Sequence, residues 1–543
     1  MKRKAVAAVL TAVMVASMFT GCGSDKGSSS AKSTSAASAA NDTVDEDGKV
    51  NGIMYQEGLP LVDEGAYTFS IFCDDSSESG EFIMLDEFKK QTNVDVDLKI
   101  YPYETATERL NLDLNSGDYA DVIGGWTLSD NAILTYGVNQ GVFIPLEDYF
   151  EKYCPNISAI LDLPGVREKM TAPDGHIYTI PYVCADSTVG YSPYINTKWL
   201  ENVGMSMPTT TDEFEAVLKA FKEQDANGNG DASDEIPFST DPNNKHIEAM
   251  AGYFGLPMNK LGIAIQNEKV VYGGVSDTYR EFLSWFHKLY AEGLVDVELY
   301  TQDSSTWEGK GNQDLYGVSI AYGSGEFTGI PAAEERGDFD SMPVLNTDKG
   351  GIWLRDTEGF SVYRTQAVIT NKAEHPEIIC RWFDNAFALE NGIGCNRGPV
   401  GVIVNKEDDG YHAIDTTTLS EEDQEKYSWG NLWPQSLPKY LPADFEFVEE
   451  HPMYDEKKAT EEAYEANLTK EIIPSYWIDL DKIDTFSDTN TAIKDFFEQQ
   501  QAQFVCGELD IDNDADWQAY VDGMYSLGLE DWVATQGIEE IAK

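Results

Sequence analysis

The feature that most constrains the fold is a regular alternation of strand-like and helix-like segments through a long body. Residues 94–100 alternate apolar and polar side chains, the pattern of a half-buried strand. Phe82, Leu85 and Phe88 form a helical stripe before this strand. Residues 120–126 after it read as a short buried strand that ends at a Gly turn. This order predicts an α/β lobe with a largely parallel sheet. A body of roughly 490 residues exceeds one simple core, so two or more lobes are expected.

Three later helices are predicted from the spacing of apolar residues. Thr210 and Glu213 fit a capping box at the start of the first helix. The second helix covers residues 276–292, and the third covers residues 376–390. The side chains expected to face inward are Phe214, Val217, Leu218, Phe221, Tyr279, Phe282, Leu283, Phe286, Leu289, Ile379, Trp382, Phe383 and Phe387.

The first 22 residues have the layout of a secretory signal. Residues 2–4 are basic, and residues 5–19 form an uncharged apolar run that is short for a membrane-spanning helix. Gly21 directly precedes Cys22, and this pair resembles a bacterial lipobox, although Phe19 stands where lipoboxes usually carry Leu. We therefore expect a signal peptide over residues 1–21 and a lipid on Cys22. The alternative is a signal peptide cut elsewhere, with Cys22 incidental.

The segment after Cys22 predicts a tether. It is rich in Ser, Ala, Thr and Asn and has little apolar mass to bury, so residues 22–58 are expected to form a flexible, lipidated linker. No later stretch of about 18 apolar residues occurs, so no spanning helix is expected. The chain is therefore expected at the extracellular face of a bacterial cell membrane.

The charge and the cysteines exclude several classes of protein. The formal net charge of −57 repels phosphate backbones, so no nucleic-acid partner is expected. The cysteines other than Cys22 contain no Cys-x-x-Cys pair, so neither a zinc site nor a redox motif is supported. In an oxidising compartment these cysteines could form disulfides or remain buried thiols, and the sequence does not show which cysteines would pair.

One polar loop carries a strong metal signal. The loop begins at Asp225. Oxygen donors stand at its first, third, fifth and seventh positions, which is the spacing of a calcium loop, and Gly230 at the sixth position permits the sharp turn. Ile236 replaces the usual closing Glu at position 12, so the two acidic residues before it are expected to close the loop. The alternative is a polar surface turn. The predicted structural Ca²⁺ ligands are Asp225, Asn227, Asn229, Asp231, Asp234 and Glu235.

Residues 194–237 as a whole carry a family resemblance. The stretches 194–204 and 207–210, the capped helix and the Asp/Asn/Gly loop ending at Pro237 resemble family 1 extracellular solute-binding lipoproteins of ABC carbohydrate importers. The nearest branch is the long, calcium-containing one that includes alginate-oligosaccharide-binding proteins, although its loop is one residue shorter before the final Asp-Glu. The stretches 116–122, 174–182, 289–294 and 504–509 are also similar to the family.

The resemblance implies an α/β, two-lobed periplasmic-binding-protein-like fold, with a ligand cleft between the lobes and several crossover segments. It also implies capture of an oligosaccharide by a monomer and delivery to the permease subunits of an ABC transporter. The N-terminal lobe is expected from residues 59–180 and 344–408. The C-terminal lobe is expected from residues 181–343, which include the calcium loop, and from residues 409–543.

The expected ligand residues are aromatic side chains that follow strands and lie near Gly, together with nearby polar groups. Aromatic faces match sugar rings, and carboxylates match sugar hydroxyls. The aromatic candidates are Trp126, Tyr182, Tyr322, Trp353, Trp429 and Trp433, and the polar candidates are Asp121, Glu326 and Arg355.

Two other functions remain open from the sequence. A peptide-binding lipoprotein would use the same cleft. An exported glycan-degrading enzyme would need a pair of carboxylates. Because the chain has 95 acidic residues, some pair always looks suitable, and its presence does not indicate an enzyme. The chain has neither a Gly-x-Ser-x-Gly elbow nor a His-Glu-x-x-His motif, so an enzyme is not expected. The excess of acidic over basic residues favours neutral oligosaccharides over negatively charged uronates as the ligand.

Overall fold

The structure is a computed structural model, and it describes residues 42–75, 81–241, 247–329, 337–442, 445–448 and 452–542. The expected signal peptide, Cys22 and the first part of the expected linker lie outside the described residues. Among the described residues, no helix is both long enough and apolar enough to cross a membrane.

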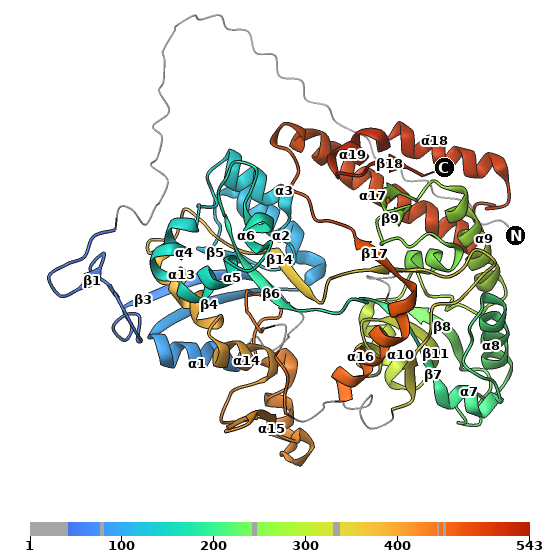
Figure 1. Cartoon of the computed structure of the whole chain (residues 1–543), viewed down its shortest axis with the longest axis horizontal. Coiled ribbons are helices and arrows are strands. Elements are labelled where there is room, and N and C mark those ends of the chain that lie inside the picture. Colours follow the sequence, from blue (N-terminus) through green and yellow to red (C-terminus); the bar gives the residue numbers. More distant parts are fainter. Residues whose placement is uncertain are drawn as a thin grey trace, which may run out of the picture. The chain divides into compact units, whose positions relative to one another are not determined.

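The first lobe is built on a five-stranded sheet with the order β4-β3-β5-β14-β6 (Figure 1). Its strands are β3 (Tyr67–Asp74), β4 (Val94–Tyr101), β5 (Val122–Gly124), β6 (Thr179–Ala185) and β14 (Phe360–Ile369). β3 pairs in parallel with β4 and β5, as the sequence predicts. β14 returns from much later in the chain and pairs antiparallel with β5 and β6, so the complete sheet is mixed.

Both faces of this sheet are covered. Ile71 and Cys73 of β3 belong to one buried cluster, whereas Phe72 between them belongs to another, as expected from side chains that alternate along a strand. The helices of this lobe are α1 (Ile83–Thr92), α2 (Tyr103–Ser116), α3 (Asp130–Ala132), η2 (Ile133–Asn139), α4 (Glu147–Tyr153), α5 (Pro155–Leu161), α6 (Val166–Met170), α13 (Pro376–Ala386) and α14 (Leu389–Arg397). α14 is followed along the chain by β15 (Val404–Glu407), β16 (Gly410–Ala413) and α15 (Glu421–Lys426).

The second lobe contains a four-stranded sheet with the order β12-β7-β11-β8. Its strands are β7 (Ser192–Asn196), β8 (Ile236–Thr240), β11 (Tyr316–Ala321) and β12 (Phe339–Ser341). The smaller sheets are built from β9 (Ile263–Gln266), β10 (Lys269–Tyr272) and β18 (Glu540–Ile541), and from β13 (Trp353–Arg355) and β17 (Leu468–Ile472). Its helices are α7 (Thr197–Val203), α8 (Thr211–Glu223), η3 (Ile247–Phe254), α9 (Asp277–Ala291), α10 (Ser304–Asn312), α11 (Gly325–Thr328), α16 (Pro452–Tyr464), α17 (Ile483–Cys506), α18 (Asp514–Ser526) and α19 (Leu529–Thr535).

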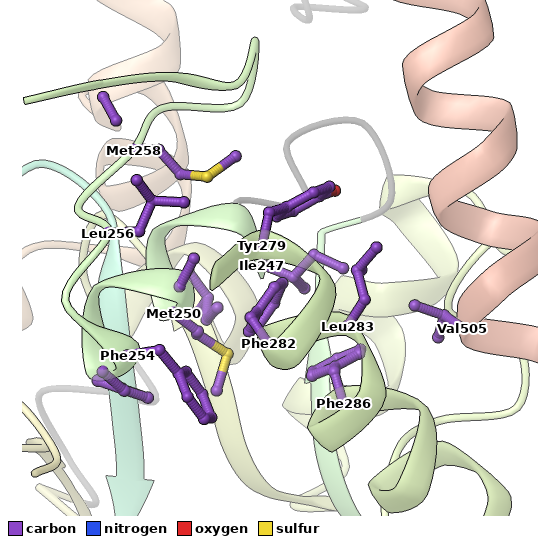
Figure 2. Close-up of a cluster of buried hydrophobic side chains, with 14 of the residues drawn as sticks. Ile247, Met250, Phe254, Leu256, Met258, Tyr279, Phe282, Leu283, Phe286 and Val505 are labelled. Atoms are coloured by element: carbon purple, nitrogen blue, oxygen red, sulfur yellow. The ribbon is translucent and has the colours of Figure 1, made fainter. Parts of the chain in front are cut away.

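The predicted helices form with the predicted faces, except that the third, α13, ends at Ala386 and leaves Phe387 as its C-cap. The Thr210 hydroxyl accepts the Glu213 N–H at 3.2 Å and caps α8. The inward-facing residues predicted for α8 and α9 are all buried. Figure 2 shows Phe282, Leu283 and Phe286 of α9 packed in the large core of the second lobe. The expected α/β class is therefore confirmed.

The two lobes are joined by crossing segments that run side by side. The Asp186 N–H donates to Gly359 O at 3.2 Å, and the Asp356 N–H donates to Thr188 O at 3.0 Å. The Glu461 carboxylate on α16 accepts the Thr188 N–H at 2.9 Å. Helix α16 therefore holds the first crossing segment from the side of the second lobe.

The lobe boundaries in the structure differ from those expected. β1 (Lys49–Val50) and β2 (Met54–Tyr55) form a hairpin within the expected linker, because Val50 and Met54 bury their side chains in the first core. Trp353 packs in the second core, so residues 344–354 do not return to the first lobe. Trp433 packs in the first core, so the chain near it belongs to that lobe and not to the second.

Candidate functional site

Trp126 stands where strand β5 ends. The carboxylate of Asp74, at the end of neighbouring β3, accepts the N–H groups of Trp126 (2.9 Å) and Thr127 (2.6 Å). Gly125 has a φ of 132°, and a Cβ at this position would lie 2.3 Å from Asp74 Oδ1. Only Gly therefore lets the loop close on Asp74. The Trp126 side chain that follows is 44% exposed.

Trp126 begins a row of aromatic rings. Its ring meets Tyr363 of β14 edge to face, with centroids 5.4 Å apart. Tyr363 stacks on Tyr182 of β6 at 5.5 Å, because the two residues are direct partners in the antiparallel pair. Tyr363 was not predicted, since nothing in its local sequence marks which face of β14 it occupies.

One carboxylate connects this row to the second lobe. Asp186 lies on the first crossing segment, just after β6. Its Oδ2 accepts the Tyr363 hydroxyl at 2.7 Å, and its Oδ1 accepts the Tyr322 hydroxyl at 3.1 Å. Tyr322 follows β11 of the second lobe, so Asp186 binds one tyrosine from each lobe.

Lys457 of α16 supports the Tyr322 side of the site. Its ammonium lies 3.9 Å from the Tyr322 ring centroid and donates to Tyr322 O and Gly190 O, each at 2.6 Å. Burial lowers the pKa of Lys457 to about 8. Nothing in the sequence around Lys457 indicates this role.

Carboxyl groups surround this lysine. Desolvation raises the pKa of Glu326 to about 7, although part of its surface stays exposed, and its Oε2 accepts the Tyr322 N–H at 2.9 Å. Desolvation also raises the pKa of Asp356 to about 6, and its Oδ2 accepts the Gly190 N–H at 2.6 Å. Such groups can accept hydrogen bonds from ligand hydroxyls.

Lys439 connects Trp429 to the Tyr182 end of the row. The Lys439 ammonium lies 5.2 Å from the Tyr182 ring centroid and 5.7 Å from the Trp429 ring centroid. Lys439 is 1% exposed, and burial lowers its pKa to about 8. The structure thus brings together five of the predicted residues, namely Trp126, Tyr182, Tyr322, Glu326 and Trp429.

The other predicted ligand residues lie elsewhere. Trp353 and Trp433 are buried and pack against core aromatic rings, so they are not available to a ligand in this structure. Asp121 precedes β5, at the opposite end of the strand from Trp126, and its carboxylate accepts the Ser70 N–H and hydroxyl, each at 2.8 Å. Arg355 donates to Thr469 O at 3.1 Å and lines a cavity of about 350 Å³ that Asp356 also lines but that none of the row's aromatic rings line.

The predicted calcium loop is folded by hydrogen bonds that its own side-chain oxygens accept. Asp225 Oδ2 accepts the Gly230 N–H at 3.0 Å, and Gly230 has a positive φ of 95°. Asn227 Oδ1 accepts the Asn229 N–H at 3.0 Å, and Asn229 Oδ1 accepts the Asp231 N–H at 2.8 Å. These bonds fold the loop tightly before it enters β8.

The acidic residues at the end of the loop close it. Asp234 accepts the side-chain amides of Asn227 (3.2 Å) and Asn229 (2.7 Å). Glu235 Oε1 accepts the Ala226 N–H at 2.8 Å. Its Oε2 is buried without a hydrogen-bond partner among the described residues, and desolvation raises the pKa of this carboxyl. A buried, unpaired carboxylate oxygen beside other oxygen donors fits a hard cation such as Ca²⁺.

The raised pKa of Glu326 predicts a pH-dependent stability. The folded chain holds the proton up to about pH 7, whereas an unfolded Glu releases it near its usual pKa of 4.5. Stability therefore falls as the pH rises from about 4.5 to about 7, and the full loss is present above about 7. In ligand-free protein, Glu326→Gln should raise the Tm at pH 8 more than at pH 5. The matched control is Glu498→Gln on the exposed face of α17. An equal change in Tm at pH 5 and pH 8 in the Glu326→Gln variant would contradict the raised pKa of Glu326.

Comparison with known proteins identifies the family. The family described as bacterial extracellular solute-binding protein matches residues 77–392. The fructooligosaccharide ABC transporter substrate-binding protein FusA of Streptococcus pneumoniae serotype 4 is 32% identical over 379 residues, which cover 67% of this chain and 68% of FusA. Lipoprotein LipO of Bacillus subtilis is 28% identical over 280 residues, which cover 50% of this chain and 52% of LipO.

Solved structures agree with the fold. FusA in complex with kestose superposes with a TM-score of 0.75 at 26% identity, covering 87% of this chain and 98% of that one. The alginate-binding protein AlgQ2 superposes with a TM-score of 0.70 at 22% identity, covering 89% and 99% of the two chains, which is a likeness of fold. These relatives are binding proteins, so the expectation of a non-enzyme is confirmed. The chain belongs to the family of bacterial extracellular solute-binding proteins.

Proposed function

We propose that this chain is a lipid-anchored receptor that captures a neutral oligosaccharide outside the cell and delivers it to the permease of an ABC transporter. The observation that carries the proposal is the row of aromatic rings bordered by hydroxyl-binding carboxylates. Rings offer faces for sugar stacking, and carboxylates and tyrosine hydroxyls offer partners for sugar hydroxyls. The name of FusA, a substrate-binding protein of an ABC transporter, supports the transport role.

Local charge favours an uncharged ligand. Besides the desolvation that raises the pKa of Glu326, Lys457 lowers this pKa, and Asp241 and Glu308 raise it, so among the described residues carboxyl groups outnumber the one cation on the second-lobe side of the row. A uronate would be repelled there, whereas neutral hydroxyls would be bound. Fructooligosaccharides are the first candidates, because FusA is named for them and was solved with kestose.

Trp126 provides the direct test of ligand binding. Trp126→Ala removes an exposed stacking surface and no core packing, so kestose affinity should fall by at least about tenfold with little change in Tm. Calorimetry and thermal melting measure the two effects. Tyr525→Ala, on α18, is the matched control, because Tyr525 is 42% exposed and lies outside the row. A large loss of Tm in the Trp126→Ala variant would make Trp126 a core residue instead.

We also propose a structural Ca²⁺ in the loop at residues 225–235. The unpaired Glu235 oxygen supports it, as does the fact that an EF-hand mutant of FusA was solved. A cation that binds the folded chain would neutralise the loop carboxylates and hold α8 against β8. We assign this ion a structural role.

Calcium should therefore raise the melting temperature. A native-state ligand at 100 times its Kd adds about 2.7 kcal/mol of stability. Melting in excess Ca²⁺ and in chelator measures the shift, and Glu235→Gln should reduce it. Glu201→Gln, exposed on α7, should leave the calcium response unchanged. Identical curves with Ca²⁺ and with chelator would eliminate the site.

The lipid anchor on Cys22 is the remaining part of the proposal. It is supported by the signal layout and by LipO, which is named a lipoprotein. A tether near a permease would keep the captured ligand at a high effective concentration for transfer. Mass spectrometry of the native N-terminus should find a diacyl group on Cys22, and Cys22→Ser should release the protein from the membrane fraction. A native N-terminus generated at another residue would disprove the anchor.

A further inference from the structure

Trp429 is a large aromatic side chain that the fold leaves half in solvent. It is 51% exposed, whereas Trp433, four residues later, is completely buried. Trp429 and Trp126 are the two exposed tryptophans of the described residues, and they stand at opposite ends of the aromatic row. A half-exposed aromatic ring can offer a stacking face to a sugar ring.

The chain around Trp429 is held in place by bonds to the first lobe. The Gln435 side chain donates to Trp429 O at 2.9 Å, and the Gln435 N–H donates to Asp75 Oδ2 at 2.7 Å. The Ser436 hydroxyl donates to Asp74 O. Since the Asp74 carboxylate also holds Trp126, both ends of the row are anchored to the end of β3.

Lys439 supports the ring itself. Its ammonium donates to Gln435 Oε1 at 2.8 Å and lies between the Tyr182 and Trp429 rings. A desolvated cation beside two aromatic faces attracts both. Trp429 is thus held beside a buried charge, while about half of its surface stays open to solvent.

The polar groups of the site gather beside Tyr363, in a part of the row that Trp429 does not contact, because Asp186 binds both Tyr363 and Tyr322. Asp186, Glu326 and Lys457 all lie around Tyr322. The groups that contact the Trp429 end, Lys439 and Gln435, are largely buried. A short oligosaccharide would therefore be held near Asp186, where its hydroxyls find most partners, and a longer one would extend along the row.

We propose that Trp429 is an outer subsite that stacks on the distal rings of longer oligosaccharides and so sets the preferred chain length. Lys439 acts as a positioning residue that holds the Trp429 ring in line with Tyr182. This inference rests on the proposed oligosaccharide-binding function and assigns ligand length to one position within it.

The test compares two ligands of different length on the full chain. Calorimetry would measure the Kd of kestose and of the longer fructo-nystose for wild type, Trp429→Ala and Trp429→Phe. Trp429→Ala should weaken fructo-nystose binding by about tenfold and kestose binding by less than about twofold. Trp429→Phe keeps a ring and should recover most of the loss. Val402→Ala, 46% exposed in the same part of the chain, is the matched control and should change neither Kd.

The outcomes separate this inference from the proposed function. Equal weakening of both ligands, or no weakening of either, would overturn the outer subsite while wild-type binding still supported the receptor role. Unchanged affinities with reduced uptake in cells would assign Trp429 to contact with the permease and overturn the subsite. Binding of neither sugar by the wild type would refute the proposed ligand class, and the outer subsite with it.

Discussion

The Asp186 carboxylate is the contact on which the candidate site depends. It lies on a segment that crosses between the lobes, and each of its oxygens accepts a tyrosine hydroxyl from a different lobe. Because a hydrogen bond to a charged group is stronger than a neutral one, this carboxylate fixes Tyr363 and Tyr322 relative to each other. A relative movement of the two tyrosines must stretch or break at least one of these bonds. In this chain, the candidate site and the crossing between the lobes therefore share one residue.

The end of β3 plays the corresponding role within the first lobe. Asp74 and Asp75 are buried where the parallel strands β3 and β5 finish, and they satisfy backbone groups of two separate loops. Ligand sites commonly form at the carboxyl ends of parallel strands, because loops converge there. Here a loop from residues 125–129 and one from residues 429–436 are held by the same short segment of β3. This common anchor places the two exposed tryptophans at either end of one row.

Buried lysines make the charge of the site unlike that of the surface. The chain carries a formal charge of −57, yet Lys439 and Lys457 lie beside aromatic rings of the row. Burial lowers the pKa of each to about 8, whereas it raises the pKa of Glu326 and Asp356. Desolvation disfavours the charged form in both cases, so it moves these four groups toward neutrality. A site of this kind suits hydroxyl-rich neutral ligands.

The sequence by itself determined the α/β class, the amphipathic helices and the residues of the Asp/Asn/Gly loop, because these depend on local periodicity and spacing. It also identified Trp126, Tyr182, Tyr322 and Trp429 as aromatic residues that follow strands or lie in Gly-containing loops. Only the tertiary structure distinguished these from Trp353 and Trp433, whose surroundings come from distant segments. Only it assigned Tyr363, Asp186, Lys439 and Lys457 to the candidate site, and only it attached the hairpin of β1 and β2 to the first core. The physical reason is that burial and charge environment are set by packing between segments hundreds of residues apart, which no local pattern records.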